Sequence, residues 1–83
     1  MEPKFWYVYL LESLVEPLRH YVGMTEDLRA RLHWHNLGQV PHTSKFRPWR
    51  IETAVVFRSR DKAAAFEKYL KSHSGRAFAK KHF

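Results

Sequence analysis

The chain has 83 residues, a length that suits one small domain with a single apolar core. Hydrophobic residues make up 45% and aromatic residues 16% of it, which excludes a disordered chain, and the absence of cysteine excludes disulfides and thiolate metal sites. The 15 Lys and Arg exceed the 8 Asp and Glu and leave a net charge of +7, which favours a polyanionic partner such as nucleic acid. A basic charge that serves solubility alone is the alternative.

The amino-terminal segment predicts a soluble, cytoplasmic protein. Residues 1–6 lack the basic stretch of a secretory leader. Glu12 and Glu16 interrupt the apolar residues that follow before these could span a bilayer. The basic residues do not gather in one amphipathic stretch, so we expect no membrane partner.

Residues 5–24 predict a β-hairpin. Residues 5–11 are aromatic or aliphatic without a break, as in a buried strand. Residues 12–18 form the connection and residues 19–24 the returning strand. Near its end, Gly23 allows a tight turn or a close approach of the backbone to a ligand.

The next segment predicts a helix. Thr25 is its capping hydroxyl, and the two acidic residues that follow complement the positive end of the helix dipole. The helix is expected to run to Asn36, because Gly38 is a typical stop.

The inner face of this helix carries two basic side chains. Leu28, Arg31, Leu32 and His35 fall at the i, i+3, i+4 and i+7 positions that face the protein body. A buried guanidinium needs an anion, so Arg31 either meets a structural carboxylate or lines a cleft that receives an anion from outside.

The remaining elements predict a loop, a strand and two helices. Residues 39–49 are a polar, basic loop, and residues 50–58 are rich in strand formers. Residues 59–71 form the second helix, with Ser59 and Asp61 at its start. Ser74 and Gly75 are expected to break it before a short terminal helix over residues 76–82.

The elements together predict one α/β domain of the α+β type over residues 1–83. A small three-stranded, antiparallel sheet is flanked by about three helices. The second helix places Glu67 on the same inner stripe as Ala63, Phe66 and Leu70, where an apolar residue is expected. An ion pair with Lys71 is the alternative role for this carboxylate.

Five elements in order resemble the core signature of the GIY-YIG nuclease family. Residues 7–9 (Tyr-Val-Tyr) and 21–23 (Tyr-Val-Gly) match its two triplets, and Arg31, His35 and Glu67 follow in the order of the family. The match runs over most of the chain, and implies the GIY-YIG fold. Tyrosine replaces glycine at the first position of the first triplet, and neither triplet loses a reactive group.

The resemblance implies a divalent-metal-dependent endonuclease that hydrolyses DNA phosphodiester bonds. Arg31 would clamp the scissile phosphate, and Glu67 would hold the metal ion. Tyr9 would activate the attacking water, with Tyr21 and His35 positioning it or relaying the proton. Which of these three finally takes the proton stays open, because an ordinary phenol has a pKa near 10.

The metal is expected to be one Mg²⁺ or Mn²⁺. Hard cations keep most of their waters and need few protein ligands, and the chain lacks the cluster of acidic residues that a two-metal site requires. We expect no small-molecule cofactor. Four other histidines lack the spacing of zinc ligands and are expected to be surface or capping residues; they are His33, His42, His73 and His82.

The basic loop and the later helix ends supply candidate DNA contacts. The loop resembles the Thr-x-x-x-Arg-Pro-Trp stretch of several stand-alone family members, in which Trp49 would be a core anchor. The predicted nucleic-acid-binding residues are Ser44, Lys45, Arg47, Lys71 and Arg76. A solvated loop without DNA contacts is the alternative.

The expected substrate is single-stranded, flap or branched DNA in repair, recombination or DNA processing. Stacking on exposed bases needs little protein surface, which suits so small a domain. No segment remains to choose the target, so a protein partner could supply specificity. One alternative is a non-catalytic nucleic-acid-binding module that uses the same basic cleft, and another is a nuclease that is active only inside a larger complex.

Overall fold

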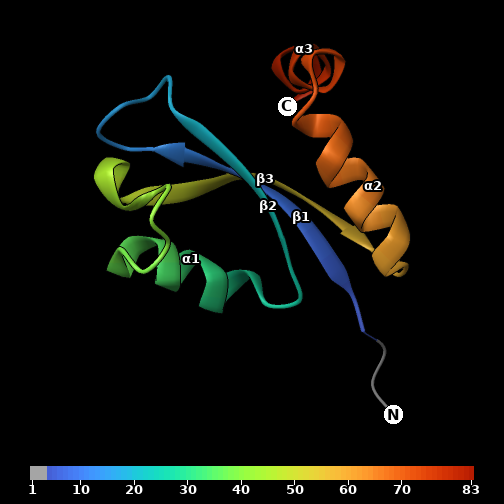
Figure 1. Ribbon diagram of the computed structural model, residues 1–83, viewed down its shortest axis with the longest axis horizontal. Coiled ribbons are helices and arrows are strands. Elements are labelled where there is room, and N and C mark those ends of the chain that lie inside the picture. Colours follow the sequence, from blue (N-terminus) through green and yellow to red (C-terminus); the bar gives the residue numbers. More distant parts are fainter. Residues whose placement is uncertain (1–3) are drawn as a thin grey trace.

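A computed structural model describes residues 4–83, and Figure 1 shows its ribbon. Residues 1–3, on which part of the prediction about a secretory leader depends, lie outside the described residues. The elements are β1 (Trp6–Ser13), β2 (His20–Thr25), α1 (Leu28–Leu37), the short 3-10 helix η1 (Ser44–Phe46), β3 (Trp49–Phe57), α2 (Arg60–Leu70) and α3 (His73–His82).

The three strands form one antiparallel sheet in the order β2-β1-β3, which confirms the predicted fold class. Tyr9 in the central strand pairs with Gly23 on one side and Ala54 on the other. The register between β1 and β3 shifts between Leu10 and Leu11. Such an irregularity leaves an extra residue on one strand, and here that residue is Glu52.

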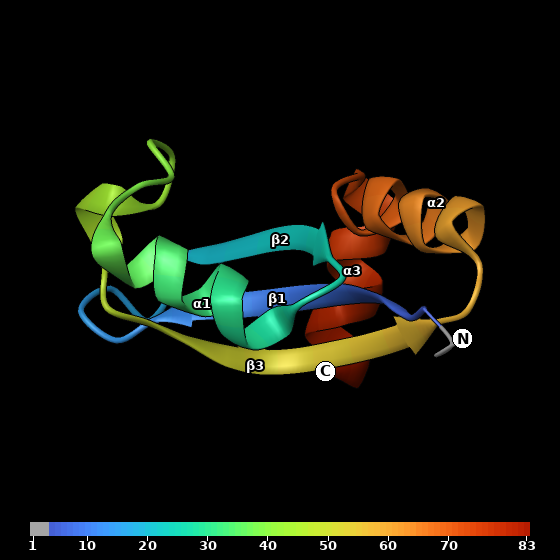
Figure 2. The same ribbon diagram turned by 90° about the horizontal axis from the view of Figure 1, so that it is seen from below.

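Helices cover both faces of the sheet. Val8 and Leu10 pack with Ala63 and Leu70 in a core beneath α2 and α3, whereas neighbouring Tyr9 and Leu11 pack toward α1. Figure 2 shows α1 in front of the sheet and α3 behind it. Because β1 is buried on both faces, its sequence is an unbroken apolar run and does not alternate.

The start of α1 differs from the prediction. The N-cap is Asp27, whose carboxylate accepts a hydrogen bond from the backbone N–H of Ala30 at 3.0 Å. The hydroxyl of Thr25 accepts a bond from the Asp27 N–H at 3.1 Å and shapes the turn before the helix. Gly38 ends the helix as predicted, with φ at 78°, a conformation that glycine adopts without strain.

The predicted break at Ser74 and Gly75 is wrong. Helix α3 begins before them, because the N-cap is Ser72, whose hydroxyl accepts a bond from the Gly75 N–H at 3.1 Å. Gly75 lies in the first turn, where a Cβ atom would collide with the backbone carbonyl of Tyr69. The glycine therefore permits close approach between α2 and α3 and does not end a helix.

The segment predicted as a loop is partly helical and leads to a buried anchor. Residues 44–46 form η1. Trp49 begins β3, is buried, and donates a hydrogen bond from Nε1 to the carbonyl of Thr43 at 2.8 Å, as expected of a core anchor. Within residues 4–83, no helix combines the length and apolarity that a membrane crossing demands.

Candidate active site

Tyr9 and Gly23 form the floor of the candidate site. The two residues pair directly across β1 and β2, and the Tyr9 ring lies over the glycine. A Cβ atom on Gly23 would collide with the Tyr9 hydroxyl. The close approach predicted at Gly23 therefore occurs, and the group that approaches is a phenol of the chain itself.

His35 connects this phenol to the loop that follows α1. Its side chain is fully buried, and Nε2 lies 3.0 Å from the Tyr9 hydroxyl. On the other side of the ring, Nδ1 lies 2.8 Å from Oγ1 of Thr43, which itself donates to the carbonyl of Val40 at 3.2 Å.

These hydrogen bonds determine which atoms of Tyr9, His35 and Thr43 carry the protons. Thr43 has one hydroxyl proton, which goes to Val40, so its oxygen accepts the proton on Nδ1 of His35. Nε2 is then the unprotonated nitrogen and accepts the hydroxyl proton of Tyr9. His35 is thereby held as the tautomer that can receive a proton from the phenol.

The surroundings hold both groups uncharged. Burial raises the pKa of Tyr9 well above its ordinary value; the neighbouring Tyr21 raises it further, Arg31 lowers it, and the carboxylate of Glu67 raises it. Burial lowers the pKa of His35, and the charge of Arg31 lowers it further. A neutral phenol facing a neutral imidazole is the resting state at neutral pH.

Tyr21 contacts the same pair from the edge strand. Its ring centroid lies 4.9 Å from that of His35 and 6.3 Å from that of Tyr9. The two tyrosines are not directly opposite, because Tyr21 pairs with Leu11 and is offset by two residues from Tyr9. Tyr7, which has the same strand parity, lies opposite Thr25, and the bond to His35 goes to Tyr9.

Arg31 has no carboxylate partner among the residues that the structure describes. Its guanidinium lies 5.1 Å from the centroid of Trp34 and lines a hollow of about 260 Å³ at the amino-terminal end of α1. Glu26 and Asp27 line the same hollow, and an external anion as the partner of Arg31 stays a prediction. Its charge reaches both Tyr9 and His35.

Glu67 approaches the site from a different layer. Helix α2 packs its apolar side on the face of the sheet away from Tyr9 and runs close to the end of β2 (Figure 2). One carboxylate oxygen pairs with Lys71 at 3.3 Å, which is the ion pair foreseen as the alternative. The second oxygen has no hydrogen-bond partner within residues 4–83, and the charge of the group acts on Tyr9.

A family comparison agrees with this arrangement. The model of the GIY-YIG catalytic domain matches residues 5–81. The chain belongs to the GIY-YIG family. This confirms the family and fold expected from the sequence.

Three curated yeast proteins are similar to this GIY-YIG domain, and each is named structure-specific endonuclease subunit SLX1. Those of Candida dubliniensis and Scheffersomyces stipitis are each 40% identical over 72 residues, which is 78% of this chain. The protein of Debaryomyces hansenii is 38% identical over 74 residues, 81% of this chain. The matches span 25%, 21% and 21% of the relatives, so the chain corresponds to about a quarter of their length or less.

GIY-YIG nucleases depend on a metal ion, and this chain offers a suitable donor for one. The oxygen of Glu67 without a protein partner is the hard ligand that Mg²⁺ or Mn²⁺ prefers. The donor set therefore fits the expected ion.

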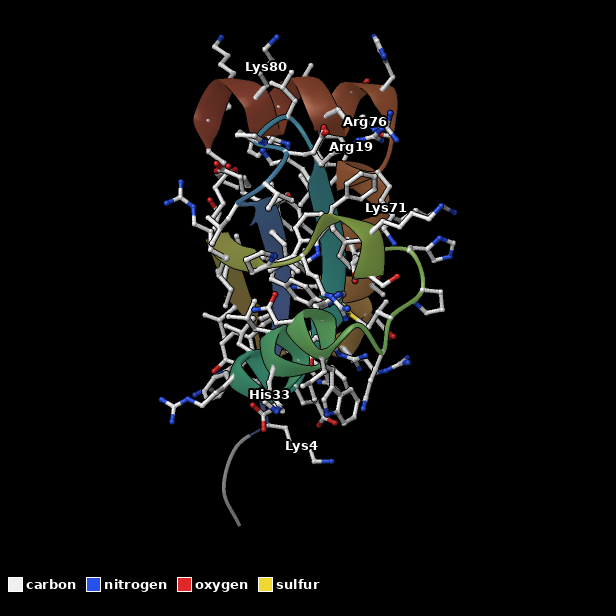
Figure 3. All side chains as sticks on the ribbon, turned by 90° about the vertical axis from the view of Figure 1, so that its left-hand side faces the viewer. Lys4, Arg19, His33, Lys71, Arg76 and Lys80 are labelled. Carbon is white, nitrogen blue, oxygen red and sulfur yellow. The ribbon has the colours of Figure 1, made fainter. Side chains whose placement is uncertain are left out.

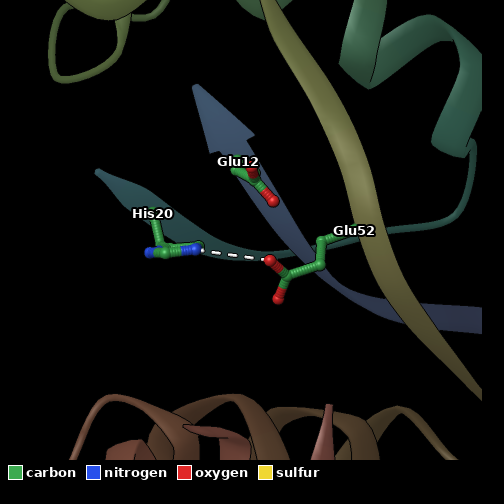
Figure 4. A group of neighbouring side chains, drawn as sticks. All are labelled: Glu12, His20 and Glu52. Atoms are coloured by element: carbon green, nitrogen blue, oxygen red, sulfur yellow. Dashed lines mark ion pairs between the residues drawn. The ribbon is translucent and has the colours of Figure 1, made fainter. Parts of the chain in front are cut away.

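A second group of metal-ligating side chains was not foreseen from the sequence. Glu12, His20 and Glu52 come from three neighbouring strands, and their ligand atoms lie within 4.8 Å of one another (Figure 4). Glu12 shares its face of β1 with Leu10, so the group lies on the α3 side of the sheet and not with the phenols. Only the register of three strands brings these residues together, which no local pattern reveals.

Existing ion pairs neutralise this second group. His20 pairs with Glu52 at 3.3 Å, and Arg50 pairs with Glu12 at 3.3 Å. A hydrogen bond with Glu52, with contributions from Arg50 and His20, holds the pKa of Glu12 below its ordinary value.

The predicted nucleic-acid-binding residues of this GIY-YIG domain divide into two sets. Ser44 and Lys45 lie in η1, and Arg47 follows it. The Ser44 hydroxyl donates a hydrogen bond to the carbonyl of Pro41, and the side chains of Lys45 and Arg47 are exposed. Lys71 and Arg76 line a groove beside α3. The sequence did not predict this division.

Thr43 is the functional residue that sequence reasoning missed. It is 1% exposed and holds His35 from a position eight residues later in the chain. The only signal was its place at the head of the Thr-x-x-x-Arg-Pro-Trp stretch. That stretch pointed to phosphate contact, whereas the structure points the hydroxyl into the protein.

Proposed function

We propose that this chain is the catalytic domain of a structure-specific endonuclease that uses one divalent ion to hydrolyse DNA at branched or flap sites. The observation that carries the proposal is the buried hydrogen-bond chain from Tyr9 through His35 to Thr43, with Arg31 beside it. A domain that only binds DNA has no need of an oriented base behind a buried phenol.

The hydrogen-bond chain supports one order of proton transfers. Tyr9 passes its hydroxyl proton to Nε2 of His35 and takes a proton from the attacking water. His35 becomes an imidazolium whose Nδ1–H still donates to Thr43. Because burial opposes the phenolate, the positive charge of Arg31 is the contribution of the chain that favours it.

Arg31 is suited to the second task, which is to bind the scissile phosphate. A guanidinium donates two parallel hydrogen bonds to phosphate oxygens, and these strengthen as negative charge builds in the transition state. The hollow of about 260 Å³ beside it opens at the same end of α1. Tyr21 is placed to position the water, since its ring contacts both Tyr9 and His35.

Glu67 is the residue that we propose to hold one Mg²⁺ or Mn²⁺. The ion supplies charge neutralisation at the phosphate and the leaving oxygen. Glu67 arrives from α2 while the other groups come from β1, β2 and α1, so the substrate lies where the two layers meet at the β2 edge.

The preference for branched substrates rests on the relatives, whose names describe structure-specific endonuclease subunits. We extend that activity to this chain, with a role in DNA repair or recombination. The word subunit also supports a protein partner that supplies specificity. Cytoplasmic location and the absence of a small-molecule cofactor stay predictions.

A cleavage assay tests the proposal. Purified protein is incubated with Mg²⁺ or Mn²⁺ and labelled single-stranded, duplex, flap and four-way DNA. We expect metal-dependent cleavage of flap or branched DNA that Glu67→Gln reduces by about 10²-fold or more, because the ion loses its ligand.

The matched control is Glu16→Gln, which removes an exposed acid from the turn between β1 and β2 and should cleave as wild type does. Equal activity of wild type and Glu67→Gln would overturn the assignment of Glu67. Salt-sensitive DNA binding without cleavage of any substrate would favour the non-catalytic binding module.

A further inference from the structure

A groove of about 780 Å³ lies on the α3 side of the sheet. Its walls come from the turn before β2, the strands beneath, the end of α2 and α3. The residues that line the groove include Arg19, Tyr21, Lys71, Arg76 and Lys80. Figure 3 shows the four cations at the α3 end of the molecule, opposite His33 and Lys4.

The groove has a strong excess of positive charge. Four cations line it, together with one carboxylate, that of Glu52, which already pairs with His20. Arg76 and Lys80 are exposed, stand one helical turn apart on α3, and form no ion pair within residues 4–83. Unpaired cations at this spacing suit successive phosphates of one strand.

The floor of the groove is apolar. Val22 and Ala79 are partly exposed in its lining, Leu10 and Leu70 are buried beneath the surface, and Leu18 is 92% exposed. An apolar floor between cationic walls matches the chemistry of a single strand, whose phosphates meet the cations while its unstacked bases cover apolar surface. A duplex keeps the faces of its bases stacked and would leave this apolar surface uncovered.

The groove meets the candidate active site at β2, the edge strand of the sheet. Tyr21 lines the groove and also packs against His35. Lys71 lines it and pairs with Glu67. A strand in the groove therefore has to pass the β2 edge to reach the residues proposed to hold the metal ion and the water.

We propose that this groove binds the single-stranded arm of the DNA substrate and guides it to the cleavage site, with Arg76 and Lys80 as phosphate contacts. The inference rests on the proposed function and adds the path of the substrate. An acidic amphipathic peptide would also match the charge, but Tyr21 and Lys71 belong to the groove and also contact His35 and Glu67, which favours the strand that is cut.

Binding is measured separately from cleavage. The fluorescence anisotropy of a labelled 20-nucleotide dT strand, and of a blunt duplex of equal length, is recorded in EDTA over a range of salt. We expect Arg76→Gln/Lys80→Gln to weaken single-strand binding by about tenfold and to lower the salt slope by about 1.4, since each phosphate contact contributes roughly 0.7.

The matched control removes two charges elsewhere. Arg58→Gln/Lys62→Gln alters two exposed cations outside the groove lining and should change binding much less. Equal losses in the two double variants, or tighter binding of duplex than of single strand, would overturn the groove proposal. Thermal unfolding of each variant verifies that α3 remains folded.

The absence of native cysteine allows a second, positional test. Lys80→Cys should cross-link to a dT strand that carries a thiol-reactive group, whereas Lys62→Cys should not. Equal cross-linking would overturn the groove proposal and leave metal-dependent cleavage untouched. Groove-dependent binding without cleavage would instead support the groove and overturn the nuclease assignment.

Discussion

Polar groups are buried on one face of the sheet and exposed on the other. Toward α1, His35 and Thr43 are at most 1% exposed and bond to each other and to Tyr9. Toward α3, His20 and Glu52 are exposed and meet in a surface ion pair. Both faces bring a histidine together with oxygen groups, but only the first removes them from water.

The buried cluster of Tyr9, His35 and Thr43 is better suited to carry the chemistry than the largely exposed cluster of Glu12, His20 and Glu52. Buried polar groups are costly unless each is satisfied, so a fully bonded buried chain fixes one geometry and one tautomer. Exposed ion pairs contribute little and leave their side chains free to rearrange. Four predictions follow the contrast from its largest expected effect to its smallest.

Removing the Tyr9 hydroxyl should have the largest effect on activity. Tyr9→Phe keeps the ring over Gly23 but eliminates the group proposed to exchange a proton with water. We expect cleavage to fall by about 10²–10⁴-fold in single-turnover assays. Tyr7→Phe is the control, since Tyr7 lies opposite Thr25, and comparable losses in both variants would contradict the assignment.

Thr43 should act through His35. Thr43→Val leaves the Nδ1 proton without an acceptor in a buried site, which should cost about 1–3 kcal/mol of stability, and cleavage should fall by about tenfold as the tautomer is lost. Thr43→Ser retains the hydroxyl and should recover most activity. Wild-type cleavage by Thr43→Val, with loss of activity in Thr43→Ser, would show that the methyl group and not the hydroxyl matters.

The pH dependence of stability and of cleavage should show that His35 is neutral in the folded protein. Its folded pKa lies below the ordinary 6.5, so the unfolded chain binds the proton first and stability falls as pH decreases below about 6.5. Activity that needs an unprotonated Nε2 should fall over the same acidic range. Thermal unfolding between pH 5.5 and 7.5 should show a weaker slope for His35→Asn, and an unchanged slope would indicate that other groups dominate.

A substitution in the largely exposed cluster of Glu12, His20 and Glu52 should have the smallest effect on stability and cleavage. Glu52→Gln removes one partner of the His20 pair, and we expect a change below about 1 kcal/mol in the free energy of unfolding, measured with urea. Cleavage should be close to that of wild type. A large loss of activity would show that the α3 face takes part in the chemistry.

Local patterns predicted most of the fold. The apolar run in β1, the capping serine of α2 and the stop at Gly38 are features of neighbouring residues, and each was confirmed. The errors occurred where two local signals competed. Thr25 and Asp27 are both residue types that cap helices, and Asp27 is the cap in the structure. Glycine usually ends helices, but Gly75 lies inside α3, where its missing side chain permits close contact with Tyr69.

The sequence by itself determined the architecture and the family, because hydrophobic periodicity, caps and an ordered signature are properties of residues close along the chain. Only the tertiary structure placed Thr43 behind His35, brought Glu12, His20 and Glu52 together, and joined the groove to Tyr21. These relations depend on strand register and on how the helices pack on the sheet, which long-range contacts decide and short patterns do not encode.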